Sequence, residues 1–161
     1  MDINPLVNIL VEEIAQDAEI ETWCQKEYGR SIQVFRNYDM RKPPTAEQCP
    51  CVCIYPSEKQ YGGQNYQDAI ECVCQVYDER TRSHADMPNI IDYTGVENVE
   101  DLRKLVLAAM ARVIEGTDAS RIDSVSVDYD TITEFPFVTA AQAAAIVTPY
   151  LIGSGNPVTN E

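Results

Sequence analysis

An alternating run of side chains over residues 70–77 constrains the fold of this chain more than any other feature. Apolar residues occupy every second position from Ile70 to Val76, and the positions between them are more polar. Residues two apart share a face of a strand, so this period predicts a strand with one face against a core. A shorter run, Cys51–Tyr55, also alternates and carries apolar side chains on both faces, as a covered sheet requires. The connection between the two runs, residues 56–67, contains two adjacent glycines and is typical of a hairpin.

Three other segments have apolar residues at helical spacing. Asn4 followed by Pro5 is a helix start, and Gly29 is placed to end a second helix. Asn98, with Asp101 three residues later, is predicted to cap a third helix, which Gly116 closes. The predicted helices cover residues 4–16, a stretch around Trp23 that ends at Tyr28, and residues 98–115.

Period-two alternation also predicts a strand over residues 122–133, and residues 32–36 are expected to be extended. The segment 139–150 is rich in alanine, which favours helix, but the aromatic and β-branched residues on either side favour a strand. We assign it as a strand, with helix as the alternative.

The order of these elements predicts one α+β domain over residues 1–152, since 161 residues leave little room for a second full domain. Its sheet is largely antiparallel, has about five strands and carries the helices on one face. The polar, aperiodic segment 78–95 is expected to be a mobile loop and a candidate contact element. Residues 153–161 are expected to form a flexible C-terminal tail.

The charge of the chain argues against two classes of partner. Lys and Arg number 12 against 26 Asp and Glu, which gives a formal net charge of −14. Binding of phosphate backbones depends on cationic side chains, so specific nucleic-acid binding is disfavoured, and docking on an anionic membrane is disfavoured for the same reason. No apolar run has the roughly 18 to 20 residues that cross a bilayer, and no secretory signal is recognised. We therefore expect a cytosolic chain whose cysteines are thiols.

The cysteines on the two central strands allow two interpretations. If the strands pair antiparallel, Cys51, Cys53, Cys72 and Cys74 could converge on one face and bind zinc. Their one-residue spacing on a strand differs from the two-residue turn of a zinc knuckle, and buried cysteine commonly fills cores as a small apolar residue. Core filling is the favoured interpretation, and the zinc site is the weaker alternative.

No residue is predicted to be catalytic, and no cofactor is predicted. His84 is the only histidine, so a nucleophile–histidine relay would have to use it, yet it lies in the polar 78–95 segment. The chain has no glycine-rich phosphate loop, nucleophile elbow or metalloprotease helix. These absences disfavour an enzyme.

One stretch of the chain, residues 30–59, is rich in bases although the protein is acidic overall. On charge alone, the favoured interpretation is that these charged faces keep an acidic protein in solution. The alternative is that faces of opposite sign let the molecule stack on copies of itself. The candidate subunit-interface residues in this stretch are Arg36, Arg41 and Lys42.

Several segments then follow one another in a recognisable order. They are the N-terminal helix, the strand Pro50–Pro56, the loop and strand Gln67–Asp78, the long helix near 98–115, and the closing strands that contain Ser126–Asp130 and Ala144–Tyr150. In this order, over most of residues 4–150, the chain resembles the tail terminator, or tail completion, proteins of long-tailed bacteriophages. It departs from them in its Cys-rich strands, its long 78–95 segment and its Ala-rich last strand.

The resemblance implies a non-enzymatic virion protein. Proteins of this family form a ring, typically a hexamer, that caps the head-proximal end of the tail tube and presents the surface that joins the head. The implied partners are further copies of the chain, the tube protein and a neck or head-completion protein, with DNA passing through the lumen unbound and no membrane involved. The implied location is the virion tail or neck, and the host cytoplasm during assembly. Another phage connector, or a cytosolic zinc–thiolate module, is the alternative.

Overall fold

A computed structural model describes residues 3–37, 41–60, 65–116, 120–130 and 135–149. Three α-helices and seven strands are present in these ranges, together with one short 3₁₀ turn. In chain order they are α1 (Ile3–Gln16), α2 (Ala18–Tyr28), β1 (Gln33–Arg36), η1 (Ala46–Gln48), β2 (Cys51–Gln60), β3 (Asn65–Tyr77), β4 (Thr81–Ser83), β5 (Ile91–Tyr93), α3 (Thr94–Glu115), β6 (Arg121–Asp130) and β7 (Phe137–Pro149).

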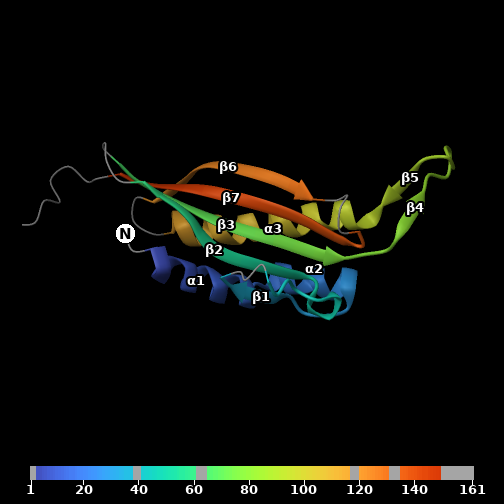
Figure 1. The fold of residues 1–161 in the computed structure, drawn as a ribbon, viewed down its shortest axis with the longest axis horizontal. Helices are drawn as coiled ribbons and strands as arrows, with labels where there is room; N and C mark the ends of the chain where they lie inside the picture. Colours follow the sequence, from blue (N-terminus) through green and yellow to red (C-terminus); the bar gives the residue numbers. More distant parts are fainter. Residues whose placement is uncertain (1–2, 38–40, 61–64, 117–119, 131–134, 150–161) are drawn as a thin grey trace, which may run out of the picture.

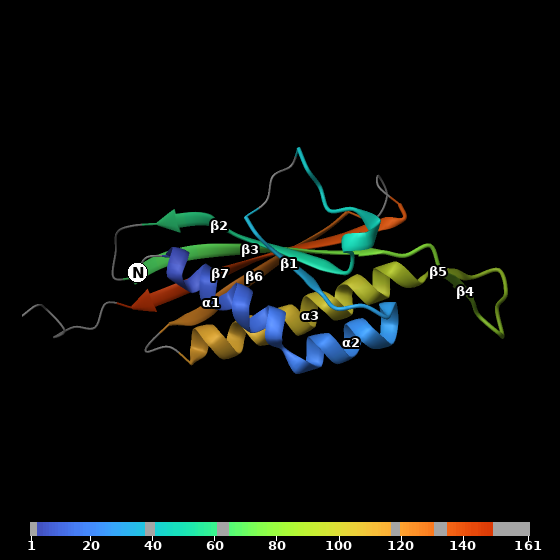
Figure 2. The ribbon, with the colours of Figure 1, turned by 90° about the horizontal axis from the view of Figure 1, so that it is seen from below.

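Five strands form the main sheet in the order β1-β2-β3-β7-β6, and β4 pairs with β5 in a separate two-stranded sheet. β1 runs parallel to β2, and every other pairing is antiparallel. All three helices lie on one side of the main sheet, as Figures 1 and 2 show. The predicted α+β fold, with helices on one face of a largely antiparallel sheet, is confirmed.

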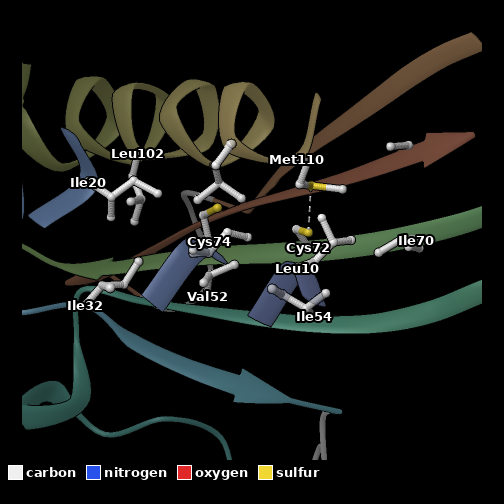
Figure 3. Close-up of a cluster of buried hydrophobic side chains, with 14 of the residues drawn as sticks. Leu10, Ile20, Ile32, Val52, Ile54, Ile70, Cys72, Cys74, Leu102 and Met110 are labelled. Carbon is white, nitrogen blue, oxygen red and sulfur yellow. Dashed lines mark hydrogen bonds between the residues drawn. The ribbon is translucent and has the colours of Figure 1, made fainter. Parts of the chain in front are cut away.

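The hydrophobic core lies between the helices and the sheet (Figure 3). Apolar side chains from one face of β2 and β3 meet the apolar stripes of α1 and α3. Cys72 belongs to this layer, and its Sγ lies 3.3 Å from Met110 Sδ on α3. The labelled core side chains in Figure 3 are Leu10, Ile20, Ile32, Val52, Ile54, Ile70, Cys72, Cys74, Leu102 and Met110.

The Ala-rich segment is a strand, and it lies inside the sheet between β3 and β6. Burial alternates along it, with Ala140 and Ala144 fully buried against the helix side and the alanines between them half-buried on the other side. Pairing with two neighbours supplies backbone hydrogen bonds along both of its edges, which outweighs the helical preference of alanine. Residue 150 of the predicted strand lies outside the described residues.

The ends of α2 follow the local sequence. Asp17 is its N-cap, and one carboxylate oxygen accepts a hydrogen bond from the Ile20 N–H at 2.9 Å. Gly29 ends the helix at φ 66°, in the left-handed region that glycine adopts without steric cost. The predicted end of this helix at Tyr28 is therefore confirmed.

The predicted start of α3 at Asn98 is wrong. The helix begins four residues earlier, at Thr94, and Asn98 is a buried residue of its second turn. Its side-chain amide donates to Tyr28 Oη at 3.1 Å and to Asp78 Oδ2 at 3.3 Å. Asn98 therefore joins α3 to α2 and to the end of β3 instead of capping the helix.

The predicted loop over residues 78–95 also differs from the structure, because β4 and β5 pair within it and α3 begins at its end. β2 and β3 are longer than predicted, so their connection is shorter than the expected 56–67. Residues 131–133 of the strand predicted over 122–133, and the tail 153–161, lie outside the described residues.

Candidate functional site

The register of β2 with β3 separates the four strand cysteines. Val52 pairs with Cys74 and Ile54 pairs with Cys72, so Cys72 and Cys74 face the core. Cys51 and Cys53 alternate with these valine and isoleucine positions and therefore face the other side of the sheet. The predicted convergence of Cys51, Cys53, Cys72 and Cys74 on one face is wrong. In the observed register each cysteine of β3 pairs with a residue between or next to the cysteines of β2, so the two pairs of cysteines lie on opposite faces of the sheet.

All six cysteines are free thiols and all are buried. Burial raises the pKa of Cys53 to about 11 and that of Cys74 to about 12. Within the described ranges, no three His, Cys, Asp or Glu residues are grouped so that they could hold a metal ion. Cys72 and Cys74 fill the core as predicted, whereas Cys51 and Cys53 are buried on the opposite side of the sheet. This separation does not support the zinc alternative.

Cys51 and Cys53 are buried although they face away from the helices. The segment around η1 lies on this side of the sheet (Figure 2), and Pro44 and Cys49 within the same segment are buried. Arg30 holds the segment by donating to the carbonyl oxygens of Glu47 at 2.9 Å and of Cys49 at 3.4 Å. The surface beyond β7, on β6, is not covered in this way, and Ser124, Ser126 and Asp128 are exposed there.

The candidate interface residues lie at the β1 edge of the sheet. Arg36 is the last residue of β1, and Arg41 and Lys42 lie in the segment that leads to η1. All three side chains are exposed. The structure therefore leaves these charges on the surface, as the interface hypothesis requires.

A second surface feature is the arm, defined here as residues 79–93, which extends beyond one end of the main sheet (Figures 1 and 2). β4 and β5 form its two sides, with Arg82 paired opposite Asp92. Successive side chains of a strand point to opposite faces, so Arg82 and Asp92 share one face of the arm while Ile91 and Tyr93 share the other.

The charged side chains on the polar face of the arm form ion pairs within the domain. Arg82 Nη2 lies 3.0 Å from Glu97 Oε1 on α3 and 3.6 Å from Asp92 Oδ2. The His84 ring nitrogen Nε2 lies 2.7 Å from Asp92 Oδ2. His84, considered above for a catalytic relay, is thus engaged with a carboxylate on an exposed hairpin.

The other face of the arm exposes large apolar side chains. Ile91 is 59% exposed, Tyr93 is 52% exposed, and Met87 at the tip is 57% exposed. The Tyr93 ring packs edge-on against Phe135, itself largely exposed, with 5.4 Å between ring centroids. Several large apolar side chains exposed on one short element are typical of an interaction site, and an isolated two-stranded hairpin is only marginally stable in water. The apolar face of the arm is therefore suited to contact a partner.

The base of the arm is fixed to the body of the domain by Asp78, the residue after β3. Asp78 is almost fully buried, and its carboxylate accepts hydrogen bonds from Tyr28 Oη at 2.9 Å and from Arg80 Nε and Nη2 at 2.9 and 2.7 Å. Burial alone would raise the pKa of Asp78, but the bonds from Arg80 and Tyr28 outweigh it, so this pKa lies below its ordinary value. The direction of the arm is set by an ionised carboxylate held between α2, α3 and the arm itself.

The sequence reasoning identified the segment that carries the arm but not its exposed apolar residues. Met87, Ile90 and Ile91 are large apolar residues in a stretch that is otherwise polar, which was the available signal.

Comparison with known proteins adds no family to this geometry. No protein-family model matches the chain, and no curated protein matches it. In the described part of the chain, no helix is long and apolar enough to cross a membrane.

Proposed function

We propose that this protein is a non-enzymatic structural subunit that forms a ring, most simply a hexamer, at the head-proximal end of a bacteriophage tail tube. There it ends tube growth and presents the surface to which the head joins. The observation that supports this proposal most directly is the arm, whose exposed apolar side chains project beyond the end of the α+β body.

Self-association through such an arm has a definite geometry. A projecting element and the surface that receives it are different parts of the molecule, so the contact is head-to-tail. Repeated head-to-tail contacts give a closed ring when the rotation between subunits closes, and an open filament when it does not. A tail terminator requires the closed form, and the exposed bases Arg36, Arg41 and Lys42 can add charge complementarity between neighbouring acidic subunits.

The charge of the chain suits passage of DNA through such a ring. With a net charge of −14 per subunit, a hexamer repels the phosphate backbone and does not retain it in the lumen. The proposed partners are further copies of the chain, the tail tube protein and a neck or head-completion protein. The proposed location is the tail or neck of the virion, after assembly in the host cytoplasm.

Native mass spectrometry of the purified protein, followed by electron microscopy of the same sample, tests the proposal. The expected result is a closed ring, with six subunits as the simplest stoichiometry, that blocks further growth when added to purified tail tubes. Rings that bind isolated heads but leave tube growth unaffected would instead identify a neck or head-completion connector. A protein that remains monomeric at its highest soluble concentration would refute assembly through the arm.

A further inference from the structure

An apolar hollow lies on the outer surface of the helix layer, between α2 and α3. It has a volume of about 450 Å³, and most of its surface is apolar. The residues that line it are Ala18, Glu19, Thr22, Trp23, Lys26 and Leu105. The hollow is shallow and largely open to solvent, so it is suited to side chains laid against it from a partner surface and not to an enclosed ligand.

The lining of the hollow leaves apolar surface in contact with solvent. Trp23 and Leu105 pack against the core on one side but are only partly buried. Around them the surface of α2 is polar, with exposed Glu19 and Lys26 at the rim. Covering this surface with an apolar group removes it from water, which is the main favourable contribution to most protein association.

The arm of the same molecule is held away from this hollow. The ion pair of Arg82 with Glu97 and the buried contacts of Asp78 fix the arm where it leaves the body, and it extends outward past the start of α3 (Figures 1 and 2). The apolar face of the arm and the apolar hollow are thus two separate surfaces of one chain. A second copy of the chain carries both surfaces, so its arm can contact the hollow of the first copy, and its hollow can receive the arm of another copy.

One pair of opposite charges can form between the two surfaces, and the rim of the hollow also carries Glu19, while Lys26 lies 3.7 Å from Glu27 within its own helix. Lys26, whose side chain is 78% exposed, lies at the rim of the hollow, and exposed Asp86 directly precedes Met87 at the tip of the arm. An exposed pair of this kind contributes little affinity but sets orientation and favours the correct encounter.

We propose that the hollow between α2 and α3 receives the apolar face of the arm from a second copy of this chain, with Met87 and Ile91 against Trp23 and Leu105. This inference rests on the proposed ring function and names the contact that would build the ring. Each subunit then contributes one arm and one hollow, so the contact is heterologous and every interface in a closed ring is the same.

The test uses two variants that each remove one surface. In the arm variant, Met87→Glu and Ile91→Glu place charges on exposed positions of the apolar face. In the hollow variant, Thr22→Arg fills the hollow from an exposed position of α2, and Thr22→Glu is a second hollow variant. The matched controls are Ala85→Glu with Asn89→Glu, which alters exposed arm positions without removing a large apolar side chain, and Gln16→Arg, which adds a base outside the hollow.

Sedimentation velocity over a range of concentrations measures association, and circular dichroism checks that each variant is folded. We expect each variant alone to associate at least ~10-fold more weakly than the wild type, because burial of a large aliphatic side chain is lost. The controls should associate as the wild type does. A 1:1 mixture of the arm and hollow variants should form a heterodimer that grows no further, because only one competent arm and one competent hollow remain in the pair.

The outcomes separate this inference from the proposed function. Wild-type association by both hollow variants, together with a monomeric arm variant, would refute the hollow as the binding surface and leave assembly through the arm intact. A mixture that stays monomeric would also refute it, because the two surfaces then do not meet. A wild-type protein that never associates would refute the proposed function itself, and with it this contact.

Discussion

Replacing Asp78 with asparagine is the most informative single perturbation of the domain. The carboxylate oxygen Oδ2 accepts from Tyr28, Arg80 and Asn98, and Oδ1 accepts from the backbone and side chain of Arg80. In the Asp78→Asn variant, one of these oxygens becomes an amide nitrogen. That nitrogen is itself a donor. It faces three donor groups if it replaces Oδ2 and two if it replaces Oδ1.

The expected cost follows from this count. Two or three hydrogen bonds are lost, at about 1 kcal/mol for each neutral bond and more for those from the Arg80 guanidinium, which is itself half-exposed. We therefore expect the free energy of unfolding to fall by about 3 kcal/mol at pH 7, or roughly 6 to 12 °C in Tm for a domain of this size. Urea denaturation followed by circular dichroism measures the difference.

The difference in free energy of unfolding between the wild type and the Asp78→Asn variant should become smaller at low pH. The pKa of Asp78 is lower in the folded state than in the unfolded chain, where it is about 4. The stabilisation is therefore fully present above pH ~4 and is lost as pH falls through the lowered folded pKa, where wild-type Asp78 becomes neutral like asparagine. The gap between wild type and variant should be constant from pH 5 to 7 and should narrow below pH 4.

Asp92→Asn is the matched control, because Asp92 is a carboxylate on the exposed arm that pairs with His84 and Arg82. Exposed ion pairs contribute little, so we expect this variant to lose less than about 1 kcal/mol. An Asp78→Asn variant as stable as the Asp92→Asn control at pH 7, or a gap that persists unchanged to pH 3, would refute the argument for the buried carboxylate.

Three further predictions concern the core, the thiols and the basic edge. Gly95→Ala places a methyl group 3.0 Å from Val138 Cγ2. We therefore expect the free energy of unfolding, measured by urea denaturation, to fall by about 1 to 3 kcal/mol. A variant as stable as the wild type would show that Val138 moves aside at no cost. Burial and the pKa of about 12 for Cys74 should prevent its alkylation by iodoacetamide at pH 8 until the chain unfolds, and mass spectrometry of the native protein would reveal any earlier modification. Reversal of the exposed bases should weaken the ring in native mass spectrometry, and unchanged assembly would remove them from the interface. The substituted residues are Arg36→Glu, Arg41→Glu and Lys42→Glu.

The sequence was most informative where a local rule determines local structure. The alternation over residues 70–77 placed β3, and Gly29 placed the end of α2. The strand at 139–150 was recognised from its flanking residues against the helical preference of alanine, but its central place between β3 and β6 was not recognised. Pairing partners far away in the chain decide that position, and no local pattern records them.

The errors share the same cause. Asn98 has the composition of an N-cap, yet its amide is used by Tyr28, 70 residues away in sequence, and by Asp78. The cysteine runs were assigned to one face because the parity of the β2–β3 register cannot be read from the two runs alone. The arm was expected to be a loop because its three-residue strands are too short to show a period. The sequence indicated residues 78–95 as a candidate contact element. Only the fold showed that they form a hairpin with its apolar side chains exposed.

The position of β7 determines when this domain can form during synthesis. β7 is the last strand to be translated among those described, yet it lies inside the sheet between β3 and β6 and pairs along its full length with β3, which was made about 70 residues earlier. A nascent chain that ends before residue 137 has β3 and β6 with nothing between them, and such non-local pairing makes folding slow relative to local helix formation. The sheet, and the core between it and the helices, therefore cannot close until residue 149 has left the ribosome.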